Sequence, residues 1–196
     1  MDSTEAQTQQ EMARIVSVVE ELTGLPSRWS GRVELVPNPT YKGAKSFSCL
    51  ISLDVALADQ DERWTTLIHE VLHSVSVGFG REDYEQGPGW EEGVVEQMQR
   101  LLRPQVLARL SVSIPQRVLN EADASHPYNS YLVALENIRE ALQTEKFPFY
   151  LRLLQTPIKG RIGIVLAGMH TMHGDDKNEL VRVFAKANAT LKKRLL

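Results

Sequence analysis

The sequence has few of the features that mark secreted or membrane proteins. Its 196 residues include one cysteine, Cys49, so no disulfide can form within the chain. No positively charged start with an apolar core, as in a secretory signal peptide, opens the sequence. The longest apolar run, residues 162–169, contains two glycines and falls far short of the roughly 20 residues of a membrane span. We therefore expect a protein of the cytoplasm that does not insert into membranes.

Neither sign of charge dominates the composition. The chain has 22 Lys and Arg against 25 Asp and Glu, for a net charge of −3, which argues against a general nucleic-acid partner. The basic run 192–194 is more simply the last turn of a helix. Hydrophobic residues at 42% and charged residues at 24% are typical of a globular protein. With no internal repeat, residues 1–196 are expected to form one domain, in which residues 103–196 could be a subdomain.

The most informative stretch is residues 64–75, which contain the sequence His-Glu-Val-Leu-His at positions 69–73. Histidines four residues apart lie one above the other on a helix, so both imidazoles can reach one tetrahedral metal ion. The intervening Glu70 lies beside them, where a general base would be needed. At 100° per residue these polar side chains occupy one face, and the opposite face is apolar: Trp64, Leu67, Ile68, Val71, Leu72 and Val75. The pattern predicts an amphipathic helix that carries a zinc site.

The remaining segments predict an α+β fold that is mainly helical. A helix over residues 4–22 is followed by two strands, 32–36 and 46–53, ahead of the zinc helix. The second strand could pair with an extended peptide by strand addition, or could equally be paired on both edges by the protein itself. Beyond residue 90 the periodicity is helical, with helices expected over 90–102, 104–110, 115–120, from 125, 149–154, 157–169 and from 176.

Two histidines do not complete a zinc site, and two carboxylates lie at a suitable distance downstream, Glu91 and Glu92. Here residues 47–102 resemble the gluzincins, zinc metallopeptidases in which HExxH is followed after roughly twenty residues by a ligand Glu. In that family Gly often follows the ligand Glu, with an acidic residue four positions on. The segment Glu92-Gly93-Val94-Val95-Glu96 has this pattern, with 18 residues between His73 and Glu92. The resemblance implies zinc ligands His69, His73 and Glu92.

Glu91 remains the alternative third ligand. It lies within the apolar stripe of its own helix, where an inward carboxylate is costly unless a metal binds it. A Trp directly before the ligand, as in thermolysin-like gluzincins, also favours Glu91. The Glu-Gly pair favours Glu92, and Glu96 would then lie one turn away as a partner for a ligand histidine.

The resemblance implies a zincin-like fold, with a small antiparallel or mixed sheet packed on the zinc helix and a helical C-terminal half. It implies a zinc-dependent metallopeptidase, acting on a peptide or protein substrate, in which Glu70 takes a proton from a zinc-activated water. Family members often stabilise the oxyanion with Tyr or His. We name Tyr131 for this role, and the other candidates are Tyr128, His126, His170 and His173.

Two other functions remain open. The chain could be a non-catalytic zinc-binding module for interaction or regulation, or a zinc hydrolase of a non-peptide substrate. Glu70 within the motif favours catalysis, because a structural zinc site is normally closed by four protein ligands and needs no base.

Overall fold

The computed structural model describes residues 3–37 and 39–194, which divide into two compact units. Unit 1 comprises Met1–Val75 and Gln99–Ala124, and unit 2 comprises Ser76–Met98 and Ser125–Leu196. The chain therefore passes between the units three times. Within the described ranges, no helix combines the length and the apolar character that crossing a membrane requires.

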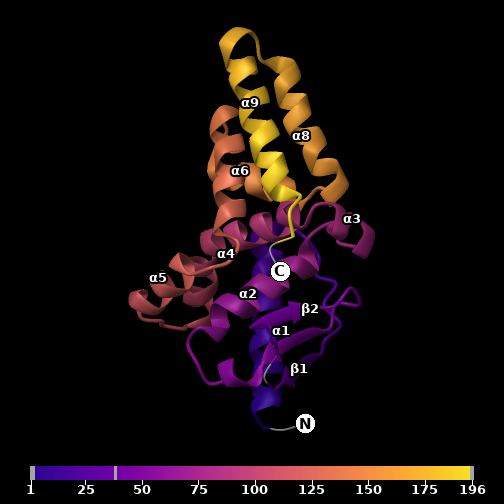
Figure 1. The fold of residues 1–196 in the computed structure, drawn as a ribbon. Coiled ribbons are helices and arrows are strands. Elements are labelled where there is room, and N and C mark those ends of the chain that lie inside the picture. The colour runs from indigo at the N-terminus through magenta and orange to yellow at the C-terminus, as the bar shows by residue number, and fades with distance from the viewer. Residues whose placement is uncertain (1–2, 38, 195–196) are drawn as a thin grey trace. The chain divides into compact units, whose positions relative to one another are not determined.

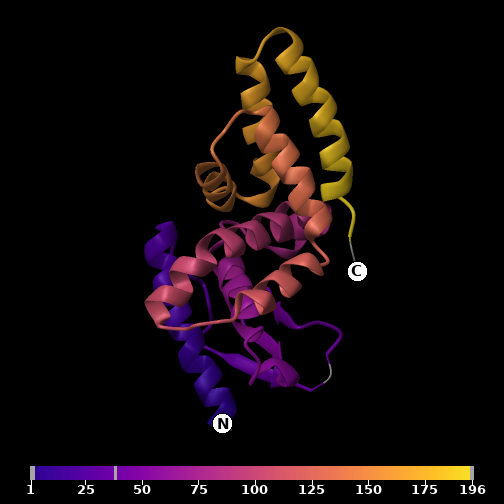
Figure 2. The ribbon, with the colours of Figure 1, turned by 90° about the vertical axis from the view of Figure 1, so that its left-hand side faces the viewer.

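Unit 1 combines a small sheet with helices (Figure 1). Its elements are α1 (Ser3–Thr23), β1 (Val33–Val36), β2 (Gly43–Lys45), β3 (Ile51–Asp54), the 3-10 helix η1 (Val55–Leu57), α2 (Arg63–Val75), the second part of α4 (Pro88–Leu110) and α5 (Gln116–Ala124). Helix α1 packs against β1 and α2, and α2 packs against β2. Figure 2 shows α1, in indigo, beside the sheet. Together with the helices of unit 2, this mixed three-stranded sheet confirms the expected mainly helical α+β fold.

The sheet has the order β1-β3-β2, so β3 is central. It pairs with β1 in parallel and with β2 antiparallel. Ile51 and Leu53 are completely buried, whereas Ser52 and Asp54, which alternate with them, are partly exposed. This alternation is the one expected for a strand with one face on the core.

The expected strand 46–53 is wrong in its extent, and of its two possible arrangements the one paired on both edges is confirmed. Cys49 has φ 62°, a left-handed conformation that interrupts an extended chain. The Cys49 N–H donates to the Ser46 carbonyl at 2.9 Å, so residues before Ile51 form a turn, and Phe47 is 42% exposed. Because β3 is paired on both sides, it offers no edge for strand addition. The edge strand next to α2 is instead β2, which the sequence did not reveal.

Helix α2 begins and ends within one residue of the prediction. All six members of its apolar stripe are buried. The opposite face is buried as well, because His69, Glu70 and His73 are each less than 8% exposed. Polar side chains on a helix normally remain in water, so burial of this face requires specific partners for its imidazoles and carboxylate.

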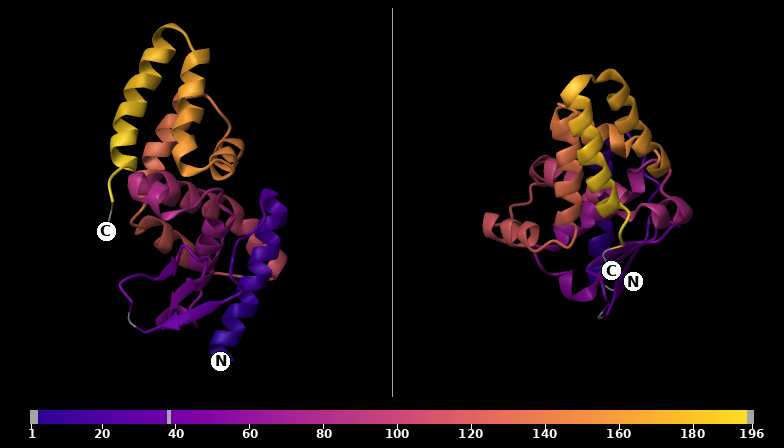
Figure 3. Two further views of the ribbon diagram at one scale, coloured as in Figure 1. Left: turned by 90° about the vertical axis from the view of Figure 1, so that its right-hand side faces the viewer. Right: turned by 45° about the horizontal axis from the view of Figure 1, so that its top comes forward.

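Unit 2 is helical. It contains α3 (Arg81–Gln86), the first part of α4, α6 (Asn129–Ala141), α7 (Lys146–Leu154), α8 (Ile158–Thr171) and α9 (Gly174–Leu191). Helices α8 and α9 form a hairpin, and α9 packs along α6 (Figure 3). The expected break at Pro104 is wrong, because α4 continues through this proline to Leu110.

Two glycines four residues apart allow the start of α4 to lie close to its neighbours in unit 2. A Cβ atom on Gly89 would lie 2.6 Å from the Tyr131 ring and 2.8 Å from the Leu191 Cα. A Cβ atom on Gly93 would lie 2.8 Å from Leu135 Cδ1. Such contacts are too short for any larger residue. Gly93, which resembles a family feature in the sequence, therefore has a packing role here.

Candidate metal centre

In unit 1, helix α2 brings His69 and His73 together. Their Nε2 atoms are 3.1 Å apart, and the ring centroids are 4.8 Å apart in an edge-to-face arrangement. Two nitrogen ligands at about 2.0–2.1 Å from one tetrahedral zinc ion would lie roughly 3.4 Å apart. The observed separation is close to that value, so the two imidazoles can share an ion after a small adjustment.

Glu70 lies on the same helix beneath the edge strand β2. A Cβ atom added to Gly43 would lie 3.2 Å from Glu70 Oε1 and 2.3 Å from Thr66 Cγ2. Glycine at position 43 therefore allows the strand to pass directly over this part of α2. The carboxylate that the sequence assigns as general base is thus next to the backbone of the edge strand.

In unit 2, Glu91 belongs to a buried ion pair. Its Oε2 atom lies 2.8 Å from Arg161 Nη2 and accepts a hydrogen bond from the Ser76 hydroxyl at 2.8 Å. The side chains of Glu91 and Arg161 are both fully buried. Burial lowers the pKa of Arg161, and the Glu91 carboxylate opposes this shift. An inward Glu91 is thus stabilised by a guanidinium, so its burial does not require a metal ion.

Arg161 has further partners in the same unit. It donates to the backbone carbonyls of Trp90 and Thr156 and to the Ser76 hydroxyl. These bonds satisfy several of the five N–H donors of a guanidinium that has no access to water. Removing the Glu91 carboxylate to bind a metal would leave this cation buried without its counter-charge.

Glu92 has a different environment from Glu91. It is 6% exposed, and its Oε1 accepts a hydrogen bond of 2.6 Å from the Tyr84 hydroxyl. Burial and then the Glu92 carboxylate raise the pKa of Tyr84 well above its ordinary value, so this hydroxyl remains a donor. A carboxylate held by a neutral hydroxyl keeps its negative charge available for a cation. Within unit 2, Glu92 is therefore the better suited of the two glutamates.

Glu96 lies close to a histidine of its own unit. His126 Nε2 is 3.4 Å from Glu96 Oε2, and Glu96 is buried. The backbone N–H of Tyr128 donates to His126 Nδ1 at 3.3 Å. A ring nitrogen that accepts cannot carry the proton, so in neutral His126 the proton belongs on Nε2 and faces Glu96. This arrangement disfavours His126 Nε2 as a metal ligand.

The hydroxyl of Tyr131 donates to the backbone carbonyl of Lys193, which links α6 to the chain after α9. Its ring is buried and stacks on Tyr128, with centroids 5.7 Å apart. This is the packing role usual for a tyrosine on an apolar helix face, and its assignment to the oxyanion stays a prediction. His170 and His173 are exposed, the first near the end of α8 and the second just before α9.

Two residues that contact the candidate glutamates, Tyr84 and Arg161, could not be predicted from the sequence. Tyr84 lies in the short helix α3, between the segments 64–75 and 90–102 for which the sequence predicts helices. Arg161 lies in α8, far from Glu91 in the sequence. Neither has a local pattern that reveals its partner.

Comparison of the chain with protein-family models, with curated proteins and with solved structures finds no match.

Proposed function

We propose that the chain is a zinc-dependent peptidase of the gluzincin type, with a zincin-like fold, in which His69, His73 and Glu92 hold the metal. The observation that carries the proposal is the His-Glu-x-x-His face of α2, in which the two imidazole Nε2 atoms are 3.1 Å apart. The spacing of Glu92, and its neutral hydrogen-bond partner, support it as the third ligand.

Two sets of side chains among the described residues could hold a metal ion. One is His69, His73 and Glu92, and the other is His69, Glu96 and His126. The proton that we place on His126 Nε2 argues against the second set. The first set has the two His and one Glu that occur in catalytic zinc sites, where three protein ligands leave a position for water or substrate.

A bound zinc ion would supply Lewis acidity to water and to a substrate carbonyl. The chain would supply the proton transfer. Glu70 is placed between the two histidines in the sequence, and its carboxylate would accept a proton from water and later donate it to the leaving amine. Glu70 is buried beside both histidines on the same helix face, which is where a base for a metal-bound water is needed.

An extended peptide would lie along β2 in this proposal. This strand is at the edge of the sheet, and Gly43 brings its backbone against Glu70. Strand addition would therefore hold a substrate next to the general base, so we expect cleavage within a chain rather than at an end.

The non-catalytic alternative is a zinc-binding module. The observation that favours it is the burial of His69, Glu70 and His73, each less than 8% exposed, since a structural zinc site is closed to solvent. Cleavage of peptides separates the two functions, whereas zinc binding is common to both.

Zinc stoichiometry tests the site itself. We expect one zinc ion per chain in the wild-type protein and substantially less in His73→Ala. His170→Ala is the matched control, because it removes an exposed histidine at the end of α8. Circular dichroism on the same samples reports whether the helices form. Full zinc occupancy in a folded His73→Ala protein would show that the assignment of the ligand is wrong.

A further inference from the structure

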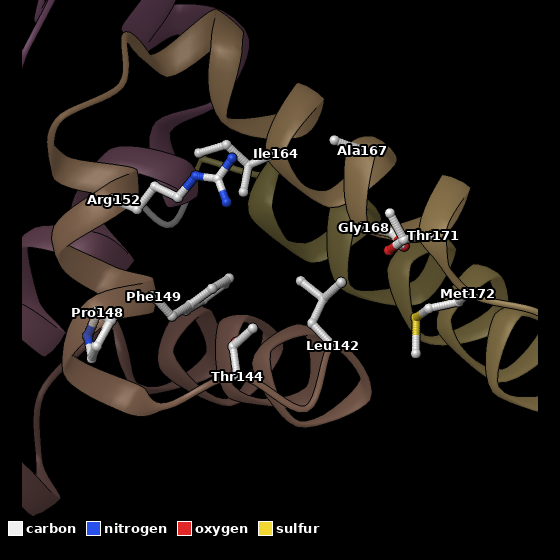
Figure 4. Close-up of a pocket in the computed structure, with 10 residues that line it drawn as sticks. All are labelled: Leu142, Thr144, Pro148, Phe149, Arg152, Ile164, Ala167, Gly168, Thr171 and Met172. Atoms are coloured by element: carbon white, nitrogen blue, oxygen red, sulfur yellow. Dashed lines mark hydrogen bonds between the residues drawn. The ribbon is translucent and has the colours of Figure 1, made fainter.

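Unit 2 contains a cleft of about 440 Å³, which no part of the proposed peptidase mechanism uses. It is formed by α7, by α8 and by the residues that follow α6. Figure 4 shows the side chains of Leu142, Phe149 and Arg152 directed into this space. A volume in this range is typical of sites for small organic molecules, roughly 300–1,000 Å³.

The cleft exists because small residues on α8 face larger ones. Ala167 and Gly168 are adjacent among the lining residues. A Cβ atom on Gly168 would lie 2.3 Å from Leu142 Cδ2, so glycine is needed for Leu142 to occupy its position. Glycine inside a helix is less favourable than alanine. The close packing of Leu142 against Gly168 offsets this cost.

The walls are mainly apolar. Leu142, Phe149 and Ile164 line the cleft from three segments of the chain. Two threonines also line it, but their hydroxyls donate within the protein: Thr171 to the Gly168 carbonyl at 2.8 Å, and Thr144 to the Arg139 carbonyl at 3.4 Å. The lining therefore suits a hydrocarbon chain, with few polar groups to orient it.

Arg152 is the one charged residue among those that line the cleft. Within the described part of the chain, its guanidinium makes no hydrogen bond or ion pair. The contrast with Arg139 is clear, since Arg139 pairs with Glu136 and Glu140 and donates to the Thr144 carbonyl. A cation without a carboxylate partner beside an apolar cleft is complementary to an amphipathic anion.

We propose that this cleft binds a small aliphatic carboxylate, with its hydrocarbon chain against Phe149, Leu142 and Ile164 and its carboxylate on Arg152. The planar guanidinium can donate two parallel hydrogen bonds to a carboxylate. Burial of the chain supplies most of the binding free energy, and the ion pair at the exposed Arg152 orients the ligand. This site is separate in chemistry from the zinc site and requires no metal.

The test uses three probes with the same chain and different head groups: octanoate, octan-1-ol and octylammonium. Titration of the 196-residue protein, followed by NMR chemical shifts, is expected to give saturable binding, tightest for octanoate, weaker for octan-1-ol and weakest for octylammonium. Arg152→Gln should weaken octanoate binding roughly threefold to tenfold while changing octan-1-ol binding less than about twofold. Arg182→Gln is the matched control, because it removes an exposed arginine of α9 that does not line the cleft.

A second variant tests the cleft without touching its charge. Ala167→Trp places an indole on the exposed wall and should abolish binding of both octanoate and octan-1-ol, with circular dichroism confirming the fold. Octanoate binding should persist in His73→Ala, which excludes a carboxylate bound to zinc. Equal affinity for octanoate and octan-1-ol, or an unchanged octanoate affinity in Arg152→Gln, would overturn the proposal.

Discussion

Arg161 and Glu91 form an ion pair in which both side chains are completely buried, with 2.8 Å between Nη2 and Oε2. The pair gives the inward-facing Glu91 a structural role in unit 2 and leaves Glu92, with its Tyr84 partner, as the candidate ligand. The two adjacent glutamates thus differ in role because their hydrogen-bond and ion-pair partners differ, and not because of their positions on the helix.

Replacing one partner of this ion pair should destabilise the protein far more than replacing both partners. We expect Glu91→Leu or Arg161→Met alone to lower the free energy of unfolding by about 3–5 kcal/mol, because each leaves a buried charge uncompensated. The double variant should recover much of this loss. Chemical denaturation of the four proteins measures the coupling.

The same double variant tests whether Glu91 binds the metal ion or only stabilises the fold. If Glu92 is the ligand, the folded Glu91→Leu/Arg161→Met protein still binds one zinc ion per chain. Loss of zinc from that folded protein would identify Glu91 as the ligand instead.

Gly43 should be essential for the approach of β2 to α2. Gly43→Ala would place Cβ 2.3 Å from Thr66 Cγ2, and we expect a destabilisation of about 1–3 kcal/mol. Thr66→Ala removes that methyl group, so the double variant should regain most of the stability in denaturation experiments. A Gly43→Ala protein as stable as wild type would contradict the close approach.

Tyr84 should tighten metal binding through Glu92. Tyr84→Phe removes the hydroxyl that donates to Glu92 Oε1 at 2.6 Å, and zinc affinity should fall roughly 10-fold to 100-fold. Competition with a metal chelator measures this affinity. Tyr41→Phe, at an exposed residue, is the control and should have no effect. Equal affinities in the two variants would remove Tyr84 from the site.

Helix α2 was predictable because its periodicity, its buried stripe and its chemistry all lie within thirteen residues. The strand before it was not, since the left-handed Cys49 interrupts an alternating pattern that favours a longer strand. Likewise, Pro104 predicts a helix boundary, yet α4 continues because Val106 and Leu107 beyond it are buried in the core. Tertiary packing outweighed local preference in that helix.

The partners of the site residues were beyond local reasoning. Arg161 is seventy positions from Glu91, and no motif connects them. Tyr84 lies in a polar segment ended by glycine and proline, which is typical of a loop as well as of the short helix α3. Sequence spacing identified the two histidines and both candidate glutamates, whereas the choice between the glutamates depends on contacts that form only in the folded unit.

Tyr150 should make the protein less stable in alkali. Burial, and then the Glu136 carboxylate, raise the pKa of Tyr150, and Glu140 adds to this shift while Arg139 opposes it. A pKa above the unfolded value of about 10 stabilises the fold fully below pH 10, and this contribution is lost as the pH rises further. The slope of unfolding free energy above pH 10 should be shallower in Tyr150→Phe by about 1.4 kcal/mol per pH unit. Identical slopes would show that Tyr150 ionises freely in the folded protein.

The most direct test of the central claim is the rate at which zinc-loaded protein cleaves an unstructured peptide, compared with zinc-loaded Glu70→Gln. The amide retains the shape of the side chain but cannot accept the proton of water, so the rate should fall roughly 10²-fold to 10⁴-fold with zinc content unchanged. Cleavage by the wild-type protein should occur within the peptide and stop when a chelator removes zinc. Equal rates in the two proteins, or no cleavage by the zinc-loaded wild type, would contradict a peptidase that uses Glu70 as its base.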